Sequence, residues 1–160
     1  MKQPLNKYTF KAPQVKKWIE EHCKDKLVLN LFAGPTRLLG CTEITNDLDE
    51  SFGTMHNSDA LDLVIRWIRT NPKYEVDVII LDPPYSYRKS MELYNGHRNS
   101  RFKRLLDIIP IILKPYGKVI TFGYHASVMG KNRGFRVKEI LIVYHSGAQH
   151  STLATVEERI

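Results

Sequence analysis

The chain has 160 residues, 42% of them hydrophobic, which is enough for one α/β domain with a sizeable core but too short for a useful second domain. Its 24 lysines and arginines against 17 acids give a net charge of +7 at pH 7, which favours a polyanionic partner such as nucleic acid. No apolar run approaches the length of a membrane span, the N-terminus lacks the apolar core of a signal peptide, and two isolated cysteines make neither a disulfide framework nor a zinc site. We therefore expect one domain over residues 1–160 of a cytoplasmic protein, with no membrane association and no bound metal.

Helix and strand signals alternate along the chain. Apolar spacing predicts helices over 14–24, 61–68 and 102–113, and strands over 27–32, 43–48, 76–81, 118–122, 137–145 and, more weakly, 152–157. The run Lys114-Pro115-Tyr116-Gly117 predicts a turn before the strand 118–122. This alternation favours right-handed crossovers and a mostly parallel sheet with helices on both faces, closed by an antiparallel terminal hairpin.

The buried strand predicted over 76–81 stops abruptly at Asp82-Pro83-Pro84-Tyr85. Neither proline can donate a hydrogen bond to a neighbouring strand, so a carboxylate, backbone carbonyls and an aromatic ring remain at the carboxyl end of the strand. This set suits a planar base that carries an amino group. The amine can donate one hydrogen to Asp82 and the other to the carbonyl of Pro83, while Tyr85 stacks on the ring. The simpler interpretation is a strand followed by an ordinary proline turn.

Asp82-Pro83-Pro84-Tyr85 after a hydrophobic strand resembles the catalytic motif of the S-adenosylmethionine-dependent methyltransferases that act on exocyclic amino groups of nucleic-acid bases, mainly adenine at its 6-amino group. The resemblance covers about residues 7–145. It implies a Rossmann-like class I methyltransferase fold, S-adenosylmethionine as the cofactor and a catalytic role for these four residues. Family members that read a DNA sequence usually carry a separate target-recognition domain, for which this chain has no room.

The resemblance also assigns a cofactor loop to the end of the first central strand. Phe32-Ala33-Gly34 looks like the family's loop, in which Gly34 lets the backbone approach the methionine part of the cofactor. The family usually has an acid where this chain has Asn30 and a second glycine where it has Thr36, which implies an altered loop or weaker binding. The alternative is an ordinary exit from a strand into a turn.

Further cofactor residues are predicted after the second central strand. An acid here hydrogen-bonds ribose hydroxyls in dinucleotide-type folds, and we choose Asp47, with Asp49 as its competitor because strand ends are uncertain by about two residues. Alignment with the family pattern puts Leu48 against the adenine face. Asp59 resembles the acid that accepts a hydrogen bond from the cofactor's amino group, although Ser58 or Asp59 could equally cap the next helix, and one residue could do both.

A basic stretch follows the catalytic motif, where Glu92 is the single acid between residues 86 and 104. The residues that we assign to nucleic-acid binding are Arg88, Lys89, Arg98, Arg101 and Arg104. Beside a base pocket, such cations would hold the phosphates on either side of an extruded nucleotide. The alternative is a solvated loop, and a second basic stretch over 131–138 could extend the surface.

These features predict methylation of the 6-amino group of adenine in nucleic acid, with DNA ahead of RNA. The motif has no cysteine, which methylation of a cytosine ring carbon would need as a nucleophile. Two alternatives stay open: methylation of an exocyclic amine of adenine, cytosine or guanine in RNA, and a non-catalytic nucleic-acid-binding subunit that keeps the fold. A homodimer or a recognition subunit would be a source of target selectivity.

Overall fold

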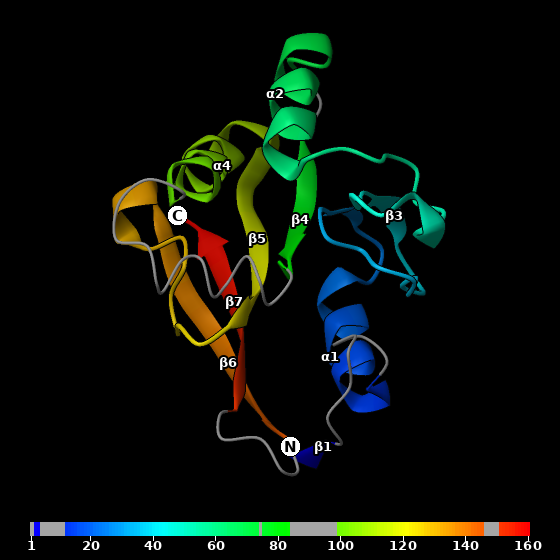
Figure 1. The fold of residues 1–160 in the computed structure, drawn as a ribbon. Coiled ribbons are helices and arrows are strands. Elements are labelled where there is room, and N and C mark those ends of the chain that lie inside the picture. Colours follow the sequence, from blue (N-terminus) through cyan, green and yellow to red (C-terminus); the bar gives the residue numbers. More distant parts are fainter. Residues whose placement is uncertain (1, 4–11, 74, 84–98, 146–150) are drawn as a thin grey trace.

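The computed structural model describes residues 2–3, 12–73, 75–83, 99–145 and 151–160 (Figure 1). Its strands are β1 (Lys2–Gln3), β2 (Leu27–Asn30), β3 (Thr42–Thr45), β4 (Val76–Leu81), β5 (Leu113–Gly123), β6 (Phe135–His145) and β7 (Thr152–Arg159). Its helices are α1 (Pro13–Cys23), α2 (Ala60–Thr70) and α4 (Asn99–Ile112), with short 3-10 turns η2 (Glu50–Phe52) and η3 (Lys131–Arg133).

The described strands form one sheet in the order β1-β6-β7-β5-β4-β2-β3. Strands β3, β2, β4 and β5 run parallel, whereas β7 lies antiparallel between β5 and β6. The expected mostly parallel sheet with an antiparallel terminal hairpin is therefore confirmed.

Helices cover both faces of this sheet, as expected (Figure 1). On one face α2 and α4 pack through side chains such as Leu61, Val64 and Leu105, and on the other α1 packs through Val15 and Ile19. Strand β4 is buried along almost its whole length because both faces are covered, which explains its continuous apolar sequence.

The strand order reverses between β2 and β4, which are direct neighbours. The chain leaves β2 toward β3 on one side, and leaves β4 toward β5 on the other. Loops that depart in opposite directions leave a crevice at the carboxyl ends of two such strands, and ligands of open α/β sheets bind there. The fold thus places the ends of β2 and β4 at a site for a ligand.

The sequence-based predictions differ most from the structure in two places. The strand predicted over 43–48 ends at Thr45, and beyond it only Asn46 pairs, through a single bridge to His56. The turn predicted over 114–117 is a bulge inside β5, because Val76 of β4 lies opposite Leu113 whereas Val78 lies opposite Lys118. The extra residues loop out with Tyr116 at a φ of 60°, and the strand then resumes.

Candidate active site

The loop after β2 is held close to the end of β3. Gly34 has a φ of 57°, a left-handed conformation that favours glycine, and its backbone N–H donates to Asp47 Oδ2 at 2.9 Å. The preceding N–H, of Ala33, donates to the carbonyl of Asn46 at 2.9 Å. Ala33 is buried, and Phe32 is partly buried against the main apolar cluster. The predicted loop residues and the predicted acid therefore meet in one place.

Asn46 connects three segments of this site. Its Nδ2 donates to the carbonyls of Leu31 at 3.1 Å and Ser58 at 3.0 Å, and its Oδ1 accepts from the N–H of Ser58 at 3.1 Å. The side chain is 1% exposed, so these bonds are made out of water, where an unmade one would be costly. Asn46 thereby fixes the β2 loop and the start of α2 relative to each other.

The two competing acids after β3 have different partners. Asp47 accepts from Gly34 through Oδ2 and from the N–H of Asp49 through Oδ1 at 3.1 Å. The Asp49 carboxylate accepts from the N–H of Ser51 at 3.0 Å and from its hydroxyl at 2.6 Å, and so caps η2. The bond from Gly34 ties Asp47 directly to the β2 loop. Leu48 follows it with 72% of its surface exposed, which leaves its side chain accessible to a ligand.

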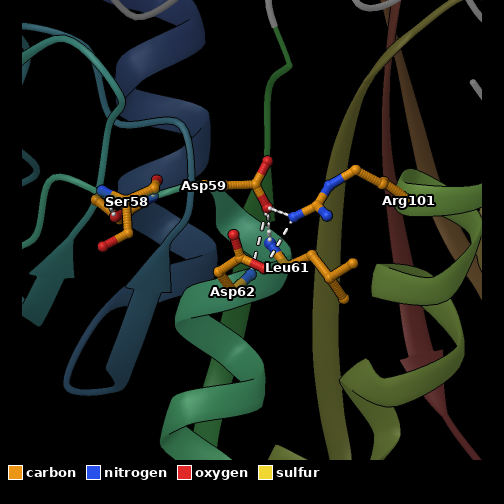
Figure 2. Close-up of polar contacts among 6 residues, drawn as sticks. Ser58, Asp59, Leu61, Asp62 and Arg101 are labelled. Atoms are coloured by element: carbon orange, nitrogen blue, oxygen red, sulfur yellow. Dashed lines mark hydrogen bonds and ion pairs between the residues drawn. The ribbon is translucent and has the colours of Figure 1, made fainter.

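Asp59 caps α2, as one of its two interpretations expected. Its Oδ1 accepts from the N–H groups of Leu61 at 3.0 Å and Asp62 at 3.3 Å. Arg101, from the first turn of α4, donates through Nη2 to Oδ1 of Asp59 and to Oδ1 of Asp62, both at 2.8 Å (Figure 2). Hydrogen bonds to Asp59 and then Asp62 raise the pKa of the Arg101 guanidinium above its ordinary value. Within the described part of the chain, Asp59 Oδ2 accepts no hydrogen bond.

Asp82 and Pro83 lie directly after β4, next to the loop that follows β2. Strand β4 pairs with β2 through Ile80 opposite Asn30, and the N–H of Leu31 donates to the carbonyl of Ile80 at 3.2 Å. Asp82 is half-buried and Pro83 is buried. Both therefore lie beside the segment that leads to Gly34. Pro84 and Tyr85 lie outside the described residues.

The predicted nucleic-acid residues are described only in part. Arg88, Lys89 and Arg98 lie outside the described residues. Arg104 is exposed on α4, whereas Arg101 is engaged with two carboxylates rather than free to bind phosphate. In the second basic stretch, salt bridges join Arg133 to Asp107 and join both Arg136 and Lys138 to Glu158.

Asn30 stands where the sequence resemblance leads us to expect an acid, and its contacts explain why an amide fits there. Asn30 is fully buried and its Nδ2 donates to Glu43 Oε1 at 2.9 Å, while Glu43 Oε2 accepts from the N–H of Leu38 at 2.9 Å. An acid at position 30 would bring two carboxylates together in a buried place, which is unfavourable. The amide instead ties β2 to β3 through Glu43.

Two residues of the site were not predicted from the sequence. Asn46 has a weak signal, since it is a polar residue beside Asp47 just after a strand. Arg37 has no sequence signal that would have identified it. Its Nη1 donates to the carbonyls of Gly34 at 2.8 Å and Thr36 at 3.0 Å, and its Nη2 donates to the carbonyl of Phe52 at 2.6 Å. The first two bonds lie within the loop and the third ties it to Phe52 at the end of η2, so Arg37 orders a loop that has Thr36 where the resemblance implies a glycine.

Other chemistries find little support in the described residues. No group of three or more His, Cys, Asp or Glu side chains in that part of the chain is placed to hold a metal ion. Cys23 is fully buried on α1, and burial raises the pKa of its thiol to about 12, so the thiol stays protonated at neutral pH. No described helix is both long enough and apolar enough to cross a bilayer.

No family model and no curated protein matches the chain. Solved structures do match its fold. TrmN from Thermus thermophilus has a TM-score of 0.62 at 19% identity, covering 92% of this chain and 48% of its own. SMU.776, a putative methyltransferase crystallised with SAH, has a TM-score of 0.62 at 16% identity, and the match covers 90% of this chain and 48% of that one. The N-methyltransferase NodS from Bradyrhizobium japonicum WM9 has a TM-score of 0.60 at 10% identity, and the match covers 91% of this chain and 94% of that one. The chain thus spans about half the length of the first two and has the class I methyltransferase fold.

Proposed function

We propose that the protein is an S-adenosylmethionine-dependent methyltransferase that acts on the 6-amino group of adenine in nucleic acid, with DNA as the first polymer to test and RNA as the second. The observation that carries the proposal is the adjacency of β2 and β4 at the reversal of strand order. It brings Asp82 and Pro83 next to the loop at Gly34.

The residues of the β2–β3 side fit the proposed cofactor. The left-handed Gly34 lacks a side chain that would keep a ligand away from the backbone, and Asp47 presents its carboxylate at that loop. Leu48 offers an exposed apolar side chain for an adenine face, and Asp59 retains one oxygen that makes no hydrogen bond among the described residues. Together these residues match the methionine, ribose and adenine parts of S-adenosylmethionine, which would supply an electrophilic methyl group.

Asp82 and Pro83 have the chemistry that a weak amine nucleophile requires. The lone pair of an exocyclic amine is delocalised into the aromatic ring. Accepting its two hydrogens at a carboxylate and a carbonyl pulls the nitrogen toward tetrahedral geometry and makes the pair available. The carboxylate of Asp82 is then the acceptor for the proton that the amine loses after alkylation. Holding both reactants in line supplies much of the rate, since effective molarities reach about 10⁵ M or more.

The placement of Asp47 leads to a test of cofactor binding. We expect Asp47→Ala to weaken the binding of S-adenosylmethionine by about 1.5 to 3 kcal/mol, the scale of hydrogen bonds to a charged group. Isothermal titration calorimetry measures the loss. Asp49→Ala is the matched control, because Asp49 caps η2 through Ser51 and should change the affinity little. A loss in Asp49→Ala with none in Asp47→Ala would assign the ribose to the other acid.

A further inference from the structure

The contact between Arg101 and Asp59 joins α4, which follows the proposed catalytic residues in the chain, to the start of α2, which lies on the proposed cofactor side. Asp59 belongs to the cofactor side, since Ser58 beside it is held by Asn46, which also holds the β2 loop. Arg101 lies in α4, the first described element after Asp82 and Pro83. Its guanidinium is therefore a direct link from the helix that follows the catalytic strand to the acid proposed for adenine.

All the described hydrogen bonds to the Asp59 carboxylate use one of its two oxygens. The N–H groups of Leu61 and Asp62 and the guanidinium of Arg101 all donate to Oδ1, at 3.0, 3.3 and 2.8 Å. In Figure 2 the other oxygen points away from the guanidinium and from the helix N-terminus. A carboxylate oxygen has lone pairs for more than one donor, so Oδ2 remains a full acceptor at the edge of the site.

We propose that Arg101 is a positioning residue for Asp59, which rests on the proposed function: it anchors Oδ1 so that Oδ2 alone is presented to the adenine amino group of the cofactor. The arginine does not touch the cofactor. It acts by restricting the rotation of a carboxylate whose side chain is 30% exposed and which the two backbone donors alone would hold less firmly. Asp62, with 64% of its side chain exposed, holds the guanidinium from the other side.

This arrangement differs from the use of Arg101 as a phosphate contact. A phosphate would have to compete with two carboxylates that already lie at 2.8 Å from Nη2. Charge-assisted hydrogen bonds of this length are among the stronger ones in proteins, and the two acids together offset the positive charge. Arg101 therefore contributes to the cofactor side of the site, while the exposed Arg104 stays available to a polyanion.

The inference predicts a loss of selectivity for the amino group of adenine. S-adenosylhomocysteine carries this amino group, whereas S-inosylhomocysteine has a carbonyl oxygen there, which a carboxylate repels. We expect the wild-type protein to bind the first about tenfold or more tightly than the second. In Arg101→Gln the ratio of the two dissociation constants should fall about fivefold, the lower range of measured couplings between groups. Arg101→Lys, which keeps a cation, should recover part of the ratio.

The matched control is Arg133→Gln, which removes another arginine bound to a carboxylate at 2.8 Å, that of Asp107 on the same helix. It should lower the melting temperature without changing the ratio. An Arg101→Gln protein that melts cooperatively and keeps the wild-type ratio overturns the inference, as does a wild-type protein that binds both ligands equally. A wild-type protein that binds neither ligand contradicts the proposed function itself, and with it the inference.

Discussion

Replacement of Asp82 by alanine should reduce methyl transfer to background while leaving the affinity for S-adenosylmethionine within a few fold. Asp82 is the proposed acceptor for one hydrogen of the target amine, and no described carboxylate replaces it at the end of β4. The cofactor contacts that we assign lie on the β2–β3 side, on Gly34, Asp47 and Asp59, so binding and chemistry should separate. Loss of a single electrostatic contact to a transition state costs about 10²- to 10³-fold in rate, and here the same group also accepts the proton.

The measurement is single-turnover transfer of a labelled methyl group, with calorimetry for cofactor affinity on the same preparation. Asp107→Ala serves as a control, because this acid lies exposed on α4, is paired with Arg133 and is assigned no role in the proposed site. It should transfer at the wild-type rate. Full activity in Asp82→Ala would remove Asp82 from the reaction and with it the proposed amine site.

The largest expected loss of stability follows from replacement of Glu157. This buried carboxylate on β7 accepts four hydrogen bonds from one loop: from the hydroxyl of Ser127 at 2.8 Å and from the N–H groups of Val128, Met129 and Gly130 at 2.8, 2.9 and 3.0 Å. Glu157→Ala would leave these donors without their acceptor. At about 1 kcal/mol or more for each unsatisfied buried group, the free energy of unfolding should fall by about 3 to 5 kcal/mol.

Glu158→Ala is the control beside it on the same strand. Glu158 pairs with Arg136 and Lys138, whose side chains are about half exposed, so water and salt screen the interaction. Its loss should cost about 1 kcal/mol or less. Denaturant unfolding of both variants at neutral pH gives the comparison. Equal losses would show that the four bonds of Glu157 contribute no more than a surface pair.

The elements with strong periodicity were predicted within one to three residues. The helix expected over 61–68 is Ala60–Thr70, and the strand expected over 76–81 is β4, Val76–Leu81. The predicted end of an element was wrong where side-chain hydrogen bonds, rather than the apolar pattern, determine the structure. Ile44, Thr45 and Leu48 continue the strand signal to residue 48, but the regular strand ends at Thr45. Beyond it the side chain of Asn46 bonds the carbonyls of Leu31 and Ser58, which the apolar pattern does not encode.

The site could be predicted where it depends on parallel strands, because the carboxyl ends of such strands meet at one edge of the sheet. Gly34 and Asp47 were each predicted just after one of two central strands, and in the structure the backbone nitrogen of Gly34 lies 2.9 Å from Oδ2 of Asp47. Contacts made by long side chains could not be predicted in this way. The segment that contains Arg101 is rich in cations, but only the packing of α2 beside α4 shows that two acids lie within its reach. Likewise, nothing in the sequence around Glu157 marks it as a buried acceptor, and the loop that donates to it is 27 to 30 residues away in sequence.

The most direct test of the central claim is the identity of the methylated product. The protein is incubated with methyl-labelled S-adenosylmethionine and with separate DNA and RNA pools, and the digested nucleosides are analysed by mass spectrometry, with Asp82→Ala in parallel. We predict label on the 6-amino group of adenine, in deoxyadenosine first and in adenosine second, and no label in the variant. Label on a ring carbon or on ribose, or cofactor binding with no transfer to either polymer, would contradict the proposal.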